Sequence, residues 1–214
     1  RTREKGQARE RNGKMRAKIG ILAQEILKQY SDIEYLCYTI AFHAAPTIMR
    51  QKAASLIIFK NGSRPLKQVW LENRECCEQY FPLRSFCLYE RPESVGVLFY
   101  QPDLLADCLL KPETKQFLAR LGYAPEMSLN EKLTALAERY QTGCPHEIGV
   151  FLDYPLHDVK AFADCRKDCL LTGYWKVYAE EKTALKRFQE FDYSKTRILQ
   201  ALLRGVSPQR VAYV

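Results

Sequence analysis

Two short segments of this chain carry the side chains best suited to acid–base chemistry. They are FHAAPT, residues 42–47, and CPHEIG, residues 144–149, and they contain two of the three histidines. An imidazole is the side chain whose ordinary pKa lets it gain or lose a proton near neutral pH. Each segment also has a proline where a helix would begin, beside backbone N–H groups that a helix start leaves unpaired. We therefore expect any chemistry of this protein to involve His43 and His146.

The elements that position these segments are predicted by the hydrophobic pattern. Apolar residues at helical spacing predict helices at residues 15–40, 65–80, 102–110, 112–121, 128–140 and 180–203. Short apolar runs bounded by turn residues predict strands at residues 55–59, 85–89, 95–100 and 170–178. A short helix is expected after Pro46, and further helices are expected to start at Pro145 and Pro155. Strands separated by blocks of helix are typical of an α+β fold, here a small mixed or antiparallel sheet packed with many helices in a single domain.

Two local patterns refine the predicted helices. Ser128 followed by Glu131 matches a capping box, in which the two side chains satisfy free N–H groups at a helix start. In the last helix the apolar spacing predicts a buried stripe formed by Leu185, Phe188, Phe191, Ile198 and Leu202.

The composition fits one globular domain with a basic extension. The chain has 214 residues, of which 47% are hydrophobic, and this is enough for a sizeable core. Its net charge of +8 is concentrated in residues 1–18, which hold eight Lys or Arg against two Glu. We predict a poorly ordered basic extension at residues 1–14, a single domain at residues 15–206 and a tail at residues 207–214. No aromatic residues alternate with the basic ones, so no specific nucleic-acid partner is expected.

The sequence also indicates the compartment. No segment is apolar over the roughly 20 residues that a membrane helix needs, and no apolar run follows the basic start as a secretory signal requires. We therefore expect a cytoplasmic protein without a membrane partner. The eight cysteines are scattered and include no CxxC pair, so we expect reduced thiols, no metal site and no cofactor.

Three spaced motifs resemble those of a known family. They are HAAPT at residues 43–47, CPHEIGVFLDYP at residues 144–155 and TGYWKVY at residues 172–178. Over residues 35–191 the chain resembles proteins of anaerobic Gram-positive bacteria that are catalogued as a domain of unknown function, number 3793. The family usually has HCAPT in the first motif, with a cysteine where this chain has Ala44. A thiol is therefore absent at position 44, either naturally or by design.

This resemblance implies a thiol-based acyl transfer at position 44. A cysteine there would precede a helix start, where the helix dipole and free N–H groups favour a thiolate and an oxyanion. His146 would act as the base, Glu147 would orient it or cap its own helix, and His43 would complete the catalytic set. These roles are similar to those in papain-like amide synthetases of anaerobes, which implies an acyl donor such as a carrier-protein thioester and an amine acceptor. We expect both histidine segments to line one cleft, and Ala44 to make this chain inactive.

A metal- or redox-linked protein is an alternative to acyl transfer. His43, Cys144 and His146 are soft ligand types, and Cys165 and Cys169 form a further pair. These candidates lie in three distant segments, so their spacing gives the metal hypothesis less support.

A noncatalytic module that binds a small ligand is the second alternative. Tyr174 and Lys176 would lie on one side of a strand and form a wall of the ligand site. Arg50 and Lys52, which follow the first motif, are candidate substrate-binding cations under either the catalytic or the binding hypothesis. A homodimer is left open.

Overall fold

The protein is described here by a computed structural model that covers residues 22–164 and 168–213. The predicted basic extension at residues 1–14, the start of the first predicted helix and Cys165 lie outside these residues. Residues 22–29 are helical. The elements that follow are α2 (Asp32–His43), α3 (Ala45–Ile48), β1 (Ala54–Lys60), α4 (Leu66–Tyr80), β2 (Arg84–Arg91), β3 (Ser94–Tyr100), α5 (Pro102–Leu110), α6 (Pro112–Ala119), α7 (Leu129–Arg139), α8 (Ile148–Phe151), α9 (Leu156–Ala163), β4 (Leu171–Thr172), β5 (Lys176–Val177), α10 (Glu181–Leu203) and the 3-10 helix η1 (Val211–Tyr213). This content confirms the predicted single-domain α+β fold.

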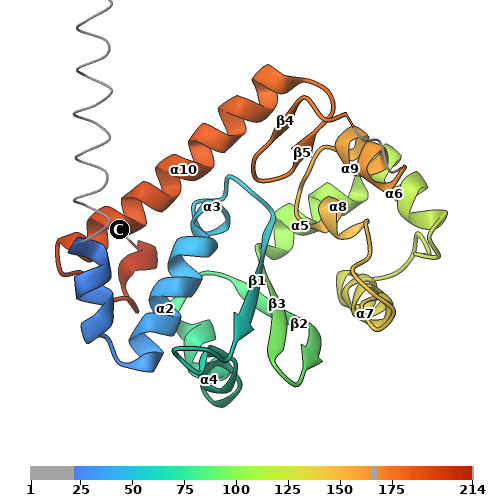
Figure 1. Cartoon of the computed structure of the whole chain (residues 1–214). Helices are drawn as coiled ribbons and strands as arrows, with labels where there is room; N and C mark the ends of the chain where they lie inside the picture. Colours follow the sequence, from blue (N-terminus) through green and yellow to red (C-terminus); the bar gives the residue numbers. More distant parts are fainter. Residues whose placement is uncertain (1–21, 165–167, 214) are drawn as a thin grey trace, which may run out of the picture.

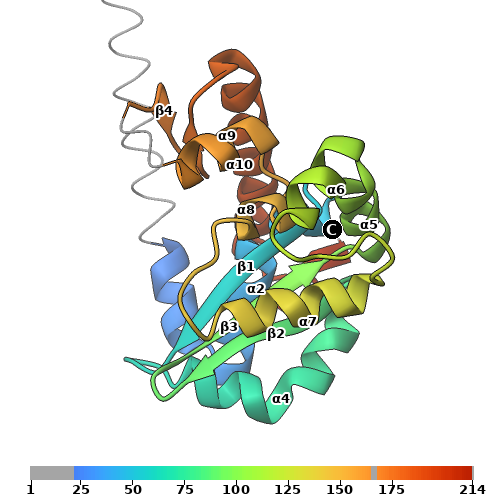
Figure 2. The ribbon, with the colours of Figure 1, turned by 90° about the vertical axis from the view of Figure 1, so that its right-hand side faces the viewer.

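The main sheet has three antiparallel strands in the order β1-β3-β2. The central strand β3 is buried on both faces because its side chains alternate between two hydrophobic clusters. Val97 and Phe99 point into the cluster with α2 and α4, whereas Leu98 points into the cluster with α5 and α7. Figure 1 shows α2 and α4 on one side of the sheet, and Figure 2 shows α7 lying across the other. The predicted strands at residues 55–59, 85–89 and 95–100 are confirmed.

Helix starts follow the local sequence at several points. Ser128 and Glu131 form the predicted capping box: the Ser128 hydroxyl accepts from the Glu131 backbone N–H, and the Glu131 carboxylate accepts from Ser128. Ser31 and Glu34 form a second box at the start of α2. Among the described residues, every helix is too short or too polar to cross a membrane.

The region predicted as one strand at residues 170–178 is a two-stranded hairpin. β4 and β5 pair across a turn that contains Gly173, Tyr174 and Trp175. The turn lies close against α10, because a Cβ added to Gly173 would come within 2.2 Å of the Phe188 ring. The prediction of a single strand was wrong. A short apolar run in the sequence does not show where the chain reverses direction, because the turn is held by packing against the distant helix α10.

Two further details of the predicted elements were wrong. Leu185 lies on the outer side of α10 and is 40% exposed, whereas Ala184, Phe188 and Phe191 form the buried stripe there. Pro145 precedes turns rather than a helix, and the helix α8 has only four residues.

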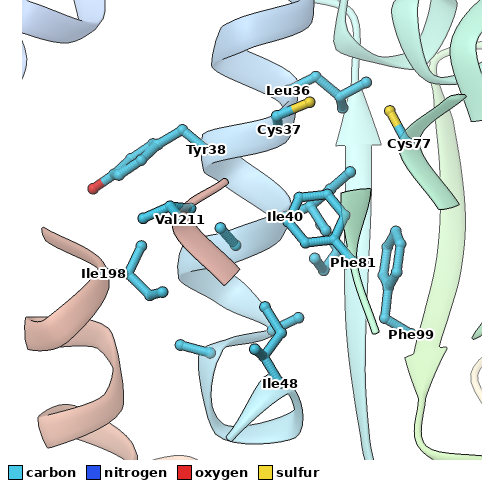
Figure 3. Packing of buried hydrophobic residues seen from close by; sticks show 14 of the residues in the cluster. Leu36, Cys37, Tyr38, Ile40, Ile48, Cys77, Phe81, Phe99, Ile198 and Val211 are labelled. Carbon is cyan, nitrogen blue, oxygen red and sulfur yellow. The ribbon is translucent and has the colours of Figure 1, made fainter. Parts of the chain in front are cut away.

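The C-terminal segment belongs to the core rather than to a free tail. Val211 in η1 is 1% exposed and joins the cluster around α2. Figure 3 shows the α2 side chains Leu36 and Ile40 between Val211 on one side and Phe99 on the other. The packed domain therefore extends beyond residue 206.

Candidate functional site

Parts of all three sequence motifs meet around a small cavity, which we call the Lys52 cavity. Its volume is about 160 Å³. Figure 1 shows α10 running from the β4–β5 hairpin past α3, so that this helix borders residues from distant parts of the chain. The lining residues include His43, Pro46, Lys52, Tyr154, Tyr174 and Lys195. Segments separated by much of the sequence thus form one site.

Lys52 is the most unusual side chain in this cavity. It is only 6% exposed, and its Nζ lies 5.0 Å from the Tyr154 ring centre and 5.9 Å from that of Phe191. Over residues 22–164 and 168–213, no carboxylate is within ion-pair distance of this Nζ and no hydrogen bond to it is found. Every fully buried side-chain nitrogen or oxygen in the same ranges has a hydrogen-bond partner, so the Nζ, which has none there, is not fully enclosed, and Lys52 lines the cavity.

The charge of Lys52 is poorly compensated, which changes its proton affinity. Burial lowers the pKa of Lys52 to about 7, and the positive charges of Arg187 and Lys195 act in the same direction. Asp153 opposes this shift. Its carboxylate is already engaged, because Arg187 donates to Asp153 Oδ2 over 2.9 Å and to its backbone oxygen over 3.0 Å. Lys52 is therefore an amine that changes charge near neutral pH.

Further basic groups surround the same cavity. Lys195 places its Nζ 4.5 Å from the Tyr174 ring centre, and burial lowers the pKa of Lys195. Partial burial and the charge of Lys195 also lower the pKa of His43, which favours its neutral imidazole. The Tyr174 hydroxyl donates to Asp192 over 2.7 Å and so is held at the cavity wall. The cavity thus combines positive charge with aromatic walls.

His146 lines a second, larger cavity of about 320 Å³, which we call the His146 cavity. Its walls are largely apolar and include Cys144, Trp175 and Lys176. Tyr154 borders both cavities and stacks on Trp175, with ring centres 5.1 Å apart. The two histidine segments therefore meet through Tyr154, but His43 and His146 line different cavities.

Glu147 has a partner other than His146. It is 2% exposed, forms an ion pair with Arg139 and accepts a hydrogen bond of 3.2 Å from the Tyr123 hydroxyl. Its side chain makes no cap bond to its own helix. Glu147 therefore neither orients the His146 imidazole nor caps α8, the two roles considered from the sequence. It instead links α7 to the loop before α8 through buried polar contacts.

Arg50 and Lys176 lie at the margins of the site. Arg50 pairs with Asp103 and donates to Gln101 over 3.2 Å, and it is not among the residues that line the Lys52 cavity. Lys176 borders the His146 cavity, with its Nζ 5.5 Å from the Phe162 ring centre. Of the four predicted substrate-binding residues, Lys52 and Tyr174 share one cavity.

Asp158 holds the aromatic hairpin in place, a role that no pattern in the sequence predicts. Its carboxylate is 3% exposed and accepts from Trp175 Nε1 over 2.8 Å and from the backbone N–H of Tyr178 over 2.7 Å. The backbone N–H of Ala179 donates to it over 3.2 Å. This carboxylate therefore anchors Trp175, which lines the His146 cavity.

Left-handed backbone conformations flank the site. Arg50, Asp153 and Glu180 are the non-glycine residues with positive φ among those described, at 58°, 58° and 53°. Such conformations are uncommon for these residue types and persist only where the surrounding structure enforces them. Arg50 precedes Lys52 by two residues and Asp153 precedes Tyr154 by one, so a left-handed residue lies just before two of the side chains that line the Lys52 cavity.

Position 44 lies in the core rather than in either cavity. Ala44 is 0% exposed and packs in the cluster around α2, and its carbonyl accepts from the N–H groups of Thr47 and Ile48 over 2.8 Å each. Burial in apolar surroundings raises the pKa of a thiol and hides it from reagents. A cysteine here would therefore be protonated and shielded.

We predict that an Ala44→Cys thiol reacts slowly. Iodoacetamide should modify it roughly 100-fold more slowly than the exposed Cys144, because alkylation requires local opening of the core. Peptide-resolved mass spectrometry over a time course measures both rates in one sample. Fast alkylation of the thiol at position 44, or its acylation by a thioester donor, would contradict this prediction and support the thiol mechanism.

No metal-binding cluster is formed within the described ranges. No three His, Cys, Asp or Glu side chains there are grouped so that they could hold an ion. His43 and His146 line separate cavities, and Cys165 lies outside the described residues. The two histidines considered as shared ligands therefore lie at different sites.

These features define a small α+β domain whose motifs surround an aromatic, positively charged cavity. The family model described as "Protein of unknown function (DUF3793)" matches residues 40–212, so the chain belongs to this family and the predicted resemblance is confirmed. No curated protein and no solved structure matches the chain. The family description names no activity.

Proposed function

We propose that the Lys52 cavity binds a small molecule that carries a carboxylate group. The observation that carries this proposal is the Lys52 ammonium, which is enclosed by Tyr154 and Phe191 and has no anionic partner among the described residues. A buried charge is costly unless it is paired, so an anion entering this cavity would gain strongly from it.

The surrounding groups favour a small, planar anion. Lys195 adds a second cation, and the Tyr154 and Tyr174 rings provide flat apolar walls. The cavity volume of about 160 Å³ lies below the usual range for drug-sized ligands, so the ligand has only a few heavy atoms. Carboxylates of this size combine one charge with a compact planar body.

Binding of acetate and benzoate tests the proposal, with acetamide and benzamide as uncharged controls. Ligand-observed NMR titration at pH 6.5 should show binding of one or both carboxylates and no comparable binding of the amides. Lys52→Met should weaken carboxylate binding at least tenfold, because it removes the buried charge. Lys60→Met removes an exposed lysine from β1 and should leave binding unchanged.

The pH dependence provides a second criterion in the same titrations. Since the pKa of Lys52 is about 7, its ammonium is lost as the pH rises through 7, and carboxylate binding should weaken between pH 6 and pH 8.5. Failure of both carboxylates to bind, or equal binding of the amides, would reject the proposal.

Acyl transfer with a thiol at position 44 has less geometric support. It requires the side chain at position 44 and His146 to reach one substrate, whereas Ala44 is buried and His146 lines another cavity. An acyl donor on a carrier protein and an amine acceptor would be the partners under that proposal. The experiment on Ala44→Cys tests the thiol mechanism, and the titrations with acetate and benzoate test carboxylate binding.

A further inference from the structure

We propose that Lys52 forms an imine with a small 2-oxo acid bound in the Lys52 cavity. This inference rests on the proposed carboxylate binding and adds a covalent step to it. In a 2-oxo acid the carbonyl carbon is bonded directly to the carboxylate carbon, so both groups fit a cavity of this size. The class of ligand is therefore narrower than carboxylates in general.

The geometry assigns different tasks to the two lysines. Lys195 lies over the Tyr174 ring at the cavity wall and provides a cation for the carboxylate. Lys52 faces the cavity without a hydrogen-bond acceptor among the described residues, so its amine is available to the adjacent carbonyl. His43 borders the same cavity and can carry protons between the reacting atoms.

The step balances without an oxidant or a reductant. The nitrogen lone pair of neutral Lys52 attacks the carbonyl carbon, and the carbon–oxygen π pair moves to oxygen. A proton passes from nitrogen to that oxygen through His43, which gives a carbinolamine. Transfer of the remaining nitrogen proton to the hydroxyl group releases water and forms the carbon–nitrogen double bond. One amine and one 2-oxo acid thus yield one imine and one water.

The surroundings make this amine more reactive than those of surface lysines. Lys52 is packed against Tyr154 and Phe191 and faces Asp153, Arg187 and Lys195, with His43 and Tyr174 across the cavity. With a pKa of about 7, about half of the Lys52 side chains are neutral at pH 7. At the ordinary lysine pKa of 10.5 the neutral fraction is only about one in 3,000. Desolvation beside another cation is an established way to activate a lysine nucleophile.

Reductive trapping with pyruvate tests the proposal on the full chain. Sodium cyanoborohydride reduces an imine to a stable secondary amine, which intact-mass and peptide mass spectrometry then locate. At pH 7 and limiting pyruvate we expect one adduct per chain at Lys52, formed at least 100-fold faster than at Lys60. An adduct distributed evenly over the exposed lysines, or its absence at Lys52, would overturn the proposal.

Variants separate covalent chemistry from carboxylate binding. Lys52→Arg keeps a positive charge but cannot form an imine, so it should bind acetate and give no adduct at position 52. Lys195→Met should lower the adduct rate at Lys52 by about tenfold, whereas Lys186→Met, an exposed change on the same helix, should not. Acetate should slow trapping in the unmodified chain. If acetate binds but pyruvate gives no Lys52 adduct, only the imine proposal fails, and if acetate does not bind, the proposed function fails.

Discussion

Replacing Asp158 by alanine is expected to lower the free energy of unfolding by about 3–5 kcal/mol. The change removes a buried carboxylate and leaves Trp175 Nε1 and the N–H groups of Tyr178 and Ala179 without their acceptor. Unpaired buried donors each cost about 1–3 kcal/mol, and partial entry of water offsets some of this. Urea unfolding followed by tryptophan fluorescence measures the difference, since Trp175 reports directly on this contact.

Matched variants distinguish this anchor from an ordinary helix carboxylate. Asp158→Asn keeps one acceptor oxygen and should lose roughly half as much stability. Asp107→Ala removes an exposed carboxylate from α5 and should change stability by less than about 0.5 kcal/mol. Under native conditions Asp158→Ala should also weaken acetate binding, because the hairpin that carries Tyr174 is loosened. A loss below about 1 kcal/mol for Asp158→Ala would show that the hairpin is held by other contacts.

Lys52→Met is expected to make the protein more stable, most strongly at low pH. Burial depresses the pKa of Lys52 from an ordinary value of 10.5 to about 7. Between these values the unfolded chain holds a proton that the folded chain has released, so stability rises with pH across this interval. Below pH 7 both states are protonated and the full penalty of the buried charge applies, up to about 5 kcal/mol. Removing the amine therefore raises the free energy of unfolding, and this gain is largest below pH 7.

Urea unfolding at pH 6, 8 and 9.5 in the presence of a reductant measures this effect. The stability gain of Lys52→Met should be greatest at pH 6 and should shrink toward pH 9.5. Lys60→Met serves as the control for removal of a lysine from the surface and should show no such trend. A gain that is constant across this range would mean that Lys52 keeps an ordinary pKa in the folded chain. A site residue that reduces stability in this way is typical of groups retained for binding or catalysis.

The helices and strands near the sheet were predictable because their signals are local. The Ser128 and Glu131 side chains satisfy N–H groups within the same helical turn, so the pattern alone locates the start of α7. The alternation in β3 likewise follows from strand geometry, which sends Val97 and Leu98 to opposite faces. The motifs that form the site were also visible in the sequence, although their arrangement in space was not.

The chemistry of the site depends on contacts between distant segments, which no local pattern records. From the sequence Lys52 was one of two cations after a helix-starting proline, but α3 ends after four residues and the turn at Arg50, with φ of 58°, brings Lys52 inside. Its unusual pKa then arises from burial against Tyr154 and Phe191, and from the charges of Arg187 and Lys195. The sequence by itself determined the fold class, most of the elements and the family motifs. Only the tertiary structure decided that Ala44 is core and that Lys52 is buried beside other cations in an aromatic cavity, because desolvation and charge proximity arise only when these segments pack together.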